Sequence, residues 1–273
     1  MKTIVITGAN SGIGFEATKQ LAKLNHRIIM VCRNEQRAQE ACQKINCDRN
    51  NVSYLIADLS NLCEIKALAE KLLQTTPTID VLINNAADFD ISNQKPKFNS
   101  QGISCQFCTN VLAPFILCEK LMPVLRKNKG KIINISTQGL CMYPFLSLDF
   151  DNLNAEKSYK ADKTYYQNKL ALLMFSLFMR DKYPDVSVHA IRVANVAIDI
   201  TRYPNVSKFS QRLYKIKSSF SISPATMAKA YVSLATGNYD GFLYNEKMKV
   251  VKANRFAYHK EAQEKLYQLL LTY

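Results

Sequence analysis

The sequence predicts a doubly wound α/β fold, in which a parallel sheet carries helices on both faces. Short runs rich in Val and Ile alternate from the first residues onward with longer stretches of helical periodicity. The short runs are apolar throughout rather than at every second residue, which is typical of strands that are buried on both faces. No repeat, low-complexity tract or linker interrupts this alternation. We therefore expect a single domain over residues 1–273.

Six strands are expected, and helical stretches separate them. Residues 12–24, after the first strand, and the charged residues 34–45, after the second, have apolar side chains at helical spacing. A helical crossover between two strands allows them to run parallel, so the pattern predicts repeated βαβ units. The expected strands are residues 3–7, 27–32, 52–57, 79–84, 131–136 and 187–193.

Two long segments interrupt the alternation, residues 140–163 after the fifth strand and 195–221 after the sixth. Ligands of open α/β sheets bind beyond the carboxyl ends of the strands, so we expect these segments to form walls or lids of a binding site. The alternative is that they are ordinary surface loops. Their aromatic residues suit either an apolar ligand or the core: Tyr143, Phe145, Phe150, Phe209 and Phe220.

The second segment contains an amphipathic stretch, residues 205–220, which predicts either a lid helix or a helix lying on an anionic membrane surface. The lid interpretation is favoured because the stretch follows the sixth strand. Its apolar residues recur at helical spacing and basic residues lie among them: Val206, Phe209, Leu213, Ile216 and Phe220, with Arg202, Lys208, Arg212, Lys215 and Lys217.

Composition excludes several function classes. The formal net charge is +14, but the 36 basic residues are scattered and form no Lys/Arg-rich block, so a nucleic-acid interface is not expected. The eight cysteines include Cys105-x-x-Cys108, which lacks a second pair at metal-ligand spacing and predicts core packing rather than a metal site. No signal-peptide pattern and no apolar run of bilayer length were found, so we expect a cytoplasmic protein.

The first expected strand runs directly into TGANSGIG, residues 7–14, and then into a helix. Gly8 allows a tight turn, while Gly12 and Gly14 let the backbone approach a pyrophosphate and let the helix pack on the strand. The helix N-terminus would present free N–H groups to the phosphates. This context favours a Rossmann-type dinucleotide loop over a structural glycine turn. The expected contacts are Gly8, Asn10, Ser11, Gly12, Ile13 and Gly14.

The end of the second expected strand favours NADP(H) over NAD(H). Proteins that bind NAD usually place an acid there to bind the ribose 2′-hydroxyl, but this sequence has Cys32, Arg33 and Asn34. A guanidinium suits a 2′-phosphate by its charge and its forked donors. We therefore expect Arg33 and Asn34 to contact the cofactor; the alternative is that Arg33 is a solvated residue at a helix start.

The segment TYYQNK contains Tyr165 and Lys169, which lie four residues apart in a helical stretch and so on one face. A tyrosine beside a lysine ammonium and a cationic nicotinamide would ionise more easily, which makes it a usable general acid and base. The pattern Tyr-x-x-x-Lys is common by chance. It supports a catalytic role only in combination with the other motifs of the chain.

Together the motifs resemble the short-chain dehydrogenase/reductase family, over essentially the whole chain, and most closely its retinol dehydrogenase-like branch. VCRNEQRAQEA, NKLALLMF, SPATMAKAYVSLATG and KEAQEKLYQLL resemble that branch. The family motifs occur in the family's order: TGANSGIG, Asp58-Leu59, Asn84-Asn85-Ala86, Asn110, Ile135-Ser136-Thr137 and Tyr165-x-x-x-Lys169.

The resemblance implies a role for each matched residue. Tyr165 would be the acid and base, Lys169 would hold the nicotinamide ribose, and Asn110 would support a proton-relay water. Asp58 and Asn84 would contact the adenosine side of the cofactor, and Leu59 and Ala86 are assigned to the same cofactor site. The resemblance also implies a homodimer or homotetramer that pairs through the helices around Asn110 and Tyr165. Residues 1–136 would form the cofactor half and residues 137–273 the catalytic and substrate-loop half.

Three positions depart from the family pattern. The serine that would bind the substrate carbonyl matches Thr137 best, with Ser136 as the alternative; either hydroxyl can donate and accept. Ala87 replaces a glycine close to the cofactor, which costs little if its φ is negative. Ala194-Asn195 replaces a Pro-Gly in the loop that usually lines the nicotinamide.

We therefore expect an NADP(H)-dependent oxidoreductase that acts on a small apolar carbonyl or alcohol, such as a ketone, an aldehyde or a retinoid-like compound. The alternative is an NADP(H)-binding regulatory or scaffold protein without turnover, which the three departures would explain. No metal site is expected, and the three histidines are assigned no catalytic role.

Overall fold

The computed structural model describes residues 1–45, 51–89, 93–196 and 221–273. Its centre is a seven-stranded sheet with the order β3-β2-β1-β4-β5-β6-β7, in which every neighbouring pair is parallel. The six expected strands are confirmed, and the structure adds a short seventh at the edge. The strands are β1 (Thr3–Thr7), β2 (Arg27–Cys32), β3 (Val52–Ile56), β4 (Val81–Asn84), β5 (Lys131–Thr137), β6 (Ser187–Val193) and β7 (Leu243–Tyr244).

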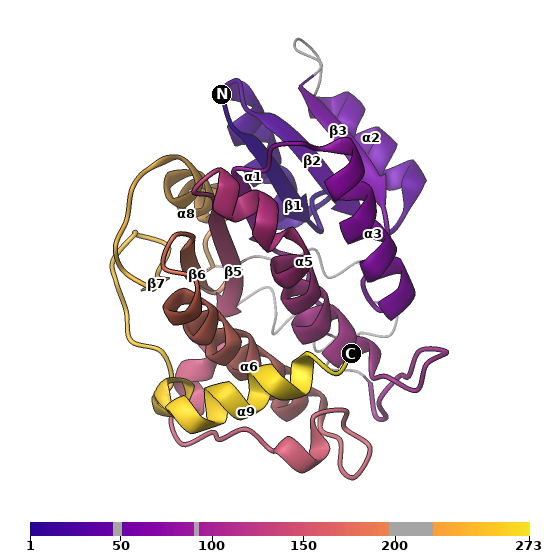
Figure 1. The fold of residues 1–273 in the computed structure, drawn as a ribbon, viewed down its shortest axis with the longest axis vertical. Coiled ribbons are helices and arrows are strands. Elements are labelled where there is room, and N and C mark those ends of the chain that lie inside the picture. Colours follow the sequence, from indigo (N-terminus) through magenta and orange to yellow (C-terminus); the bar gives the residue numbers. More distant parts are fainter. Residues whose placement is uncertain (46–50, 90–92, 197–220) are drawn as a thin grey trace.

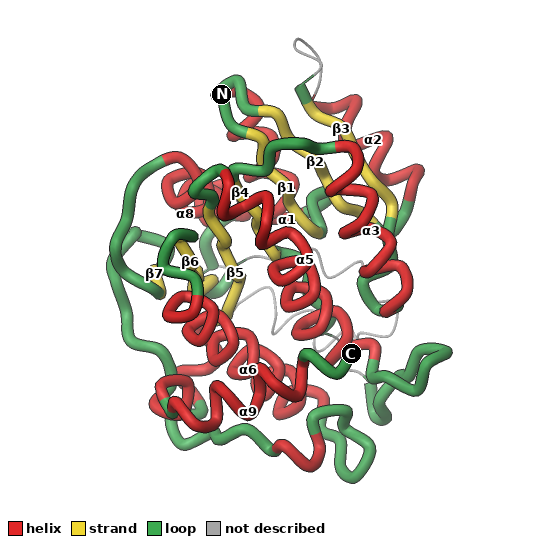
Figure 2. The backbone as a smooth tube through the Cα atoms, viewed as in Figure 1, coloured by secondary structure: helices red, strands yellow, loops and turns green. Residues whose placement is uncertain are grey.

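Helices cover both faces of the sheet, as the doubly wound fold requires (Figures 1 and 2). One face is covered by α1, α2 and α8, and the other by α3, α5, α6 and α9, each face with its own apolar core. The helices are α1 (Gly12–Lys23), α2 (Glu35–Ile45), α3 (Leu62–Thr75), α4 (Cys105–Phe107), α5 (Ala113–Lys127), α6 (Ala161–Lys182), α8 (Pro224–Thr236) and α9 (Lys260–Leu270).

Side chains that accept hydrogen bonds set where several helices begin. Asn61 accepts from the N–H of Cys63 at the start of α3, and Ser223 accepts from Thr226 at the start of α8. Each bond satisfies one of the N–H groups that a helix leaves free in its first turn. No side-chain cap of this kind is present at the first turn of α1, where Ser11 is the N-cap. The N–H groups of that turn lie at the candidate site described below.

The sheet places the candidate site at its topological switch point. From β1 the chain moves outward to β2 and β3, and it then returns to β4 on the other side of β1. The loops after β1 and β4 therefore diverge at the carboxyl edge of the sheet, which is where open α/β sheets bind their ligands.

The structure bears on the expectations about membrane-spanning runs and about the cysteines. The stretch Cys105–Lys127 is long and apolar enough to span a bilayer by length and composition, which corrects the expectation that no such run exists, but 78% of its window is buried inside the protein. No disulfide joins the seven cysteines in the described ranges, and Cys108 is buried in the core as expected. No group of metal-ligating side chains occurs among the described residues.

Candidate active site

The loop between β1 and α1 has the conformation that a bound phosphate needs. Gly8 and Gly12 have φ values of +64° and +59°, which only glycine adopts without strain. Ser11 is the N-cap of α1, but its side chain does not cap the helix, and the first turn has no acidic residue. Among the described residues, no side-chain cap and no acid of the first turn neutralises the N–H groups and the positive dipole end of α1 at the switch point.

Gly14 lets α1 lie directly against the glycine loop. A Cβ atom at this position would be 2.5 Å from the Gly8 carbonyl oxygen and 2.6 Å from Nδ2 of Asn85. Both distances are shorter than any van der Waals contact, so a side chain would push the helix away from the loop.

Gly14→Ala is expected to lower the free energy of unfolding by about 2 kcal/mol and to weaken dinucleotide binding, because overpacking at this contact displaces α1. Gly102→Ala is the matched control: Gly102 has a φ of +72° and nothing within 4 Å of the added Cβ, so only backbone strain of about 1 kcal/mol is added. Denaturant unfolding and NADPH titration of both variants measure the difference. Equal losses of stability and unchanged binding would contradict this role for Gly14.

Asn85 joins the loops after β1 and β4, a role that the sequence analysis missed. Its side-chain amide donates to the carbonyls of Thr7 at 2.9 Å and Gly8 at 3.2 Å, and its Oδ1 accepts from the Tyr231 hydroxyl at 3.1 Å. The Thr7 hydroxyl accepts from the N–H groups of Asn85 and Ala86 in return. The sequence signal that could have predicted this role was an asparagine at the end of a strand beside the switch point.

Ala86 and Ala87 line the same loop. Ala86 is half-buried, and its Cα would be 3.0 Å from a Cβ on Gly8, so the two loops touch. Ala87 is exposed and is not among the described residues with positive φ, so its methyl group is accommodated without strain.

The side chain of Arg33 is exposed just after β2, where a cofactor 2′-substituent is expected. The side chain of Asn34 instead accepts from the N–H of Arg37 at 2.9 Å and so supports the start of α2. Cys32 is buried, which raises the pKa of its thiol to about 11.

The two assigned residues after β3 lie near the same edge. Asp58 is half-buried and its Oδ1 accepts from the backbone and hydroxyl of Ser60, which fixes the turn. The side chain of Leu59 is buried in the core, so only its backbone is available to a cofactor. In the glycine loop, Asn10 and Ile13 are half-buried.

Asn84 differs from the expectation that its side chain contacts the adenosine side of the cofactor. It is 5% exposed, and its Nδ2 donates to Oδ1 of Asn134 at 2.8 Å. Asn134 donates in turn to the Ser176 hydroxyl on α6 at 2.7 Å. Asn84 therefore belongs to a buried polar network that links β4, β5 and α6, and its side chain points into the protein.

Tyr165 and Lys169 lie one turn apart on α6, as their spacing predicts. The Lys169 ammonium is 5.8 Å from the centre of the Tyr165 ring and donates to the Ile135 carbonyl of β5 at 2.8 Å. Lys169 is 2% exposed, and its burial lowers the pKa of the ammonium to about 8. Neither of the two ion pairs among the described residues involves this lysine. Within the described parts of the chain, its charge therefore acts on the phenol beside it without a neutralising acid.

Lys169→Met is expected to stabilise the cofactor-free protein while abolishing turnover. The folded-state pKa lies below the usual 10.5, so the unfolded chain binds more protons between pH 8 and 10.5 and wild-type stability rises with pH across that window. The cost of the buried charge is complete below pH 8 and amounts to at most about 3 kcal/mol. Thermal unfolding at pH 7 and pH 10.5 should show a gain for the variant that shrinks at the higher pH. A variant less stable than wild type at pH 7 would contradict the assignment.

Asn110 lies in a π-helical turn, Cys108–Leu112, between α4 and α5. Its side chain accepts from the N–H of Asp88 at 3.0 Å and donates to the Asp88 carbonyl at 2.8 Å. The wide turn and this pair of hydrogen bonds hold the loop after β4 in place. π-Helical turns inside helices are frequent at functional sites, and no sequence signal predicted this one.

The two candidate hydroxyls at the end of β5 have different surroundings. Ser136 is 2% exposed and its hydroxyl has no hydrogen-bond partner among the described residues. Thr137 is half-buried, and its hydroxyl accepts from the N–H of Gly139 at 3.1 Å, which leaves its own proton available to a ligand. Successive strand residues point to opposite faces, and Ser136 shares the face of Asn134 that contacts α6.

Aromatic rings surround Tyr165. Phe89, from the loop after β4, stacks on it with ring centres 4.2 Å apart. Tyr166 contacts Tyr165 edge-on at 5.5 Å and lies 4.7 Å from Tyr143, which comes from the long segment after β5. Phe145 of that segment is 88% exposed, whereas Phe150 packs against the core. The amphipathic stretch 205–220, with Phe209 and Phe220, lies outside the described residues.

The chain resembles known proteins both in sequence and in fold. A family model described as short chain dehydrogenase matches residues 2–147. Human retinol dehydrogenase 14 is 31% identical over an alignment of 254 residues that covers 86% of this chain and 74% of the relative. An alcohol dehydrogenase from the archaeon Thermococcus sibiricus, complexed with 5-hydroxy-NADP, has a TM-score of 0.67 at 17% identity and covers 94% of this chain and 97% of its own. A metagenomic short-chain oxidoreductase in complex with NADP has a TM-score of 0.64 at 21% identity and covers 92% and 96%.

Proposed function

Because the chain belongs to the short-chain dehydrogenase/reductase family of nicotinamide-dependent oxidoreductases, we propose that it is an NADP(H)-dependent enzyme that moves a hydride between the nicotinamide and a carbonyl or alcohol carbon of a small apolar substrate. The observation that carries the proposal is the pairing of Tyr165 with the buried ammonium of Lys169 on α6, which forms no ion pair with a described residue. A tyrosine hydroxyl beside a fixed positive charge is suited to giving up and taking back a proton.

The described residues fit such a cofactor along its length. The uncapped N–H groups at the start of α1 would hold the pyrophosphate, and Arg33 would bind the 2′-phosphate of the adenosine ribose. Lys169 would hold the nicotinamide ribose while it supports Tyr165. The bound cofactor supplies the hydride, and the protein supplies orientation and proton transfer.

In the reducing direction, the Tyr165 hydroxyl gives its proton to the oxygen of the substrate carbonyl, which becomes an alcohol. The tyrosinate that remains is stabilised by the ammonium of Lys169. We assign the hydroxyl of Thr137 to the substrate oxygen as a second donor, because it is more accessible than the buried hydroxyl of Ser136 and its own proton is free to donate. Asn110 holds the loop that carries Phe89 against the phenol.

The aromatic surroundings of Tyr165 support an apolar substrate. Phe89, Tyr143 and Tyr166 offer ring surface around the reacting hydroxyl, and ring faces favour apolar or conjugated groups. Retinol dehydrogenases among the relatives are named for such a compound. We therefore include retinoid-like alcohols and aldehydes beside smaller ketones and aldehydes in the proposed substrate class.

The test is a spectrophotometric assay of the purified protein with NADPH or NADH across a panel of ketones, aldehydes, quinones and retinal. Oxidation of NADPH by one or more carbonyls, faster than with NADH, is the expected result. Tight NADPH binding without turnover on the whole panel would overturn the enzymatic proposal in favour of a regulatory role.

A further inference from the structure

Tyr143 belongs to the aromatic group around Tyr165, but its own segment gives it little support. This wall segment, residues 138–148, begins directly after β5 and contains a short 3-10 helix, Gln138–Met142, at whose end Tyr143 lies. Phe145, two residues further along, is 88% exposed. The position of the Tyr143 ring therefore depends on contacts with other parts of the chain.

Helix α6 contacts the side chain of Tyr143. The Tyr143 hydroxyl donates to Oδ2 of Asp162 at 3.0 Å, and its ring lies 4.7 Å from the ring of Tyr166. Asp162 is in the first turn of α6, and Tyr166 follows one turn later, beside Tyr165. The side chain of Tyr143 is therefore aligned with the part of α6 that carries the proposed acid.

The backbone of Tyr143 is bound by Asn254, which lies 111 positions further along the chain, between β7 and α9. Nδ2 of Asn254 donates to the Tyr143 carbonyl at 2.8 Å and, over a longer distance of 3.4 Å, to the Pro144 carbonyl. Its Oδ1 accepts from the N–H of Phe256 at 2.9 Å and so caps the 3-10 helix Arg255–Tyr258. One end of the amide thus binds the wall segment and the other end binds the C-terminal segment, which requires a donor and an acceptor in one side chain.

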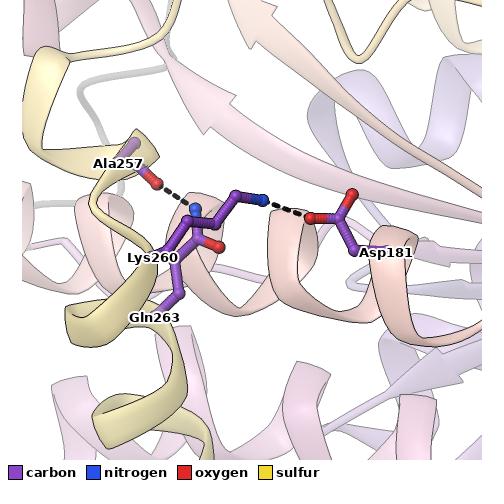
Figure 3. A network of polar contacts seen from close by, with 4 residues as sticks. All are labelled: Asp181, Ala257, Lys260 and Gln263. Carbon is purple, nitrogen blue, oxygen red and sulfur yellow. Dashed lines mark hydrogen bonds and ion pairs between the residues drawn. The ribbon is translucent and has the colours of Figure 1, made fainter.

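The 3-10 helix that Asn254 caps is fixed to the rest of the protein. Its residue Ala257 is fully buried, and the Ala257 carbonyl accepts from the side chain of Gln263 at 2.6 Å (Figure 3). Lys260, at the start of α9, forms an ion pair with Asp181 near the C-terminal end of α6 (Figure 3). Asn254 therefore presents its amide from a segment that is anchored on α6 itself.

We propose that Asn254 is a positioning residue of the substrate site: it holds the Tyr143 carbonyl and thereby fixes the aromatic wall beside Tyr165, which sets the space for the apolar part of the substrate. The inference rests on the proposed oxidoreductase function, in which Tyr165 is the acid. A neutral hydrogen bond of this kind shifts the balance between a fixed and a displaced segment by about two- to tenfold. Because Asn254 acts on the wall and not on the reacting groups, its loss should weaken substrate binding and leave proton transfer intact.

Asn254→Asp isolates the bond to the wall. A carboxylate of the same shape still accepts from the N–H of Phe256 and caps the 3-10 helix, but it cannot donate to the Tyr143 carbonyl. The N–H groups of Tyr143 and Leu146 form hydrogen bonds inside the wall segment, at 3.1 Å each, so their exchange with deuterium reports its opening. Exchange of residues 138–148 should be about two- to tenfold faster in the variant.

Asn245→Asp is the matched control, because it makes the same change of side chain in the same C-terminal segment. Oδ1 of Asn245 accepts from the N–H groups of Lys247 and Lys249 at 3.0 Å, and a carboxylate keeps both bonds. Exchange of the wall segment should then match wild type. Wild-type exchange of residues 138–148 in Asn254→Asp, or equally fast exchange in the control, would overturn the inference. This measurement needs no activity, so its outcome does not depend on the proposed function.

Steady-state kinetics with NADPH separate positioning from a general loss of stability. With a bulky apolar carbonyl such as retinal, Asn254→Asp should raise KM by about two- to tenfold and keep kcat within about threefold of wild type. A small carbonyl such as butanone, which does not reach the wall, should keep both parameters, and so should Asn245→Asp with either substrate. A fall in kcat with both carbonyls at unchanged KM would overturn the positioning role. A wild-type protein that turns over no carbonyl would instead contradict the proposed function, and hydrogen exchange would still decide whether Asn254 holds the wall.

Discussion

Tyr165→Phe is expected to reduce kcat for carbonyl reduction by about 10³-fold or more, with NADPH binding unchanged within about threefold. The substitution removes one hydroxyl and keeps the ring that stacks on Phe89. General acid catalysis by a positioned side chain contributes on the order of 10²–10⁴ in rate, and this hydroxyl is the proposed acid. The ammonium of Lys169, 5.8 Å from the ring, stays in place for its proposed contact with the nicotinamide ribose. Steady-state kinetics and a fluorescence titration with NADPH measure the two effects.

Tyr166→Phe is the matched control, because it removes the same hydroxyl from the next residue of α6. Tyr166 is also half-buried and belongs to the same group of rings, but its ring packs against Gly139 and Tyr143 rather than beside Lys169. Its kcat should stay within about threefold of wild type, as expected for a side chain whose hydroxyl takes no part in proton transfer. Either of two results would contradict the proposed role of Tyr165. One is a Tyr165→Phe enzyme that keeps a tenth or more of wild-type kcat, and the other is a Tyr166→Phe enzyme whose kcat falls as far as that of Tyr165→Phe.

The sheet could be predicted closely because each strand is a short apolar run between helical stretches. The bounds of β1, β2 and β6 agree with the expected residues, and β5 extends only one residue further, to Thr137. Buried parallel strands lack polar positions, so their ends are marked sharply by Gly, Asn and Asp. The seventh strand, Leu243–Tyr244, was missed because two residues are too short for a periodic signal.

The candidate site was predicted less completely, because side-chain direction is a tertiary property. The motif pattern predicted Tyr165, Lys169 and Asn110 as site residues, but it could not show that Asn84 points inward to Asn134 while Asn85 joins the two loops. Adjacent strand-end residues point in opposite directions, and the sequence does not say which one faces the cleft.

Long-range packing also could not be predicted from the sequence. The amphipathic pattern of Lys260–Leu270 predicts a helix with one buried face, yet nothing in it specifies that α6 is the partner. The stack of Phe89 on Tyr165 joins residues 76 positions apart and has no local signal. Such contacts depend on how the layers assemble rather than on the periodicity of either segment.

Arg33→Asp is expected to reverse the proposed preference for NADPH, changing the ratio of kcat/KM for NADPH to that for NADH by about 10³-fold or more. Arg33 is exposed at the end of β2, where its guanidinium can pair with a 2′-phosphate. A hydrogen bond to a charged group contributes about 1.5–3 kcal/mol, so loss of the Arg alone accounts for about 10- to 100-fold. The new carboxylate repels the 2′-phosphate of NADPH and can accept a hydrogen bond from the 2′-hydroxyl of NADH. It therefore lowers kcat/KM for NADPH further and raises kcat/KM for NADH.

Arg27→Asp is the control for net charge, because Arg27 is an exposed residue at the opposite end of the same strand. It changes the charge of the protein by the same amount, so any general electrostatic attraction of the more anionic NADPH is altered equally. The ratio should then stay within about threefold of wild type, since charges separated by more than about 10 Å are screened at 0.1 M salt. Equal effects of the two substitutions would show that NADPH is favoured by net charge alone. A wild-type enzyme that prefers NADH would show that the guanidinium at position 33 does not read the 2′-phosphate, and the cofactor would then be held by the loop after β1 irrespective of that group.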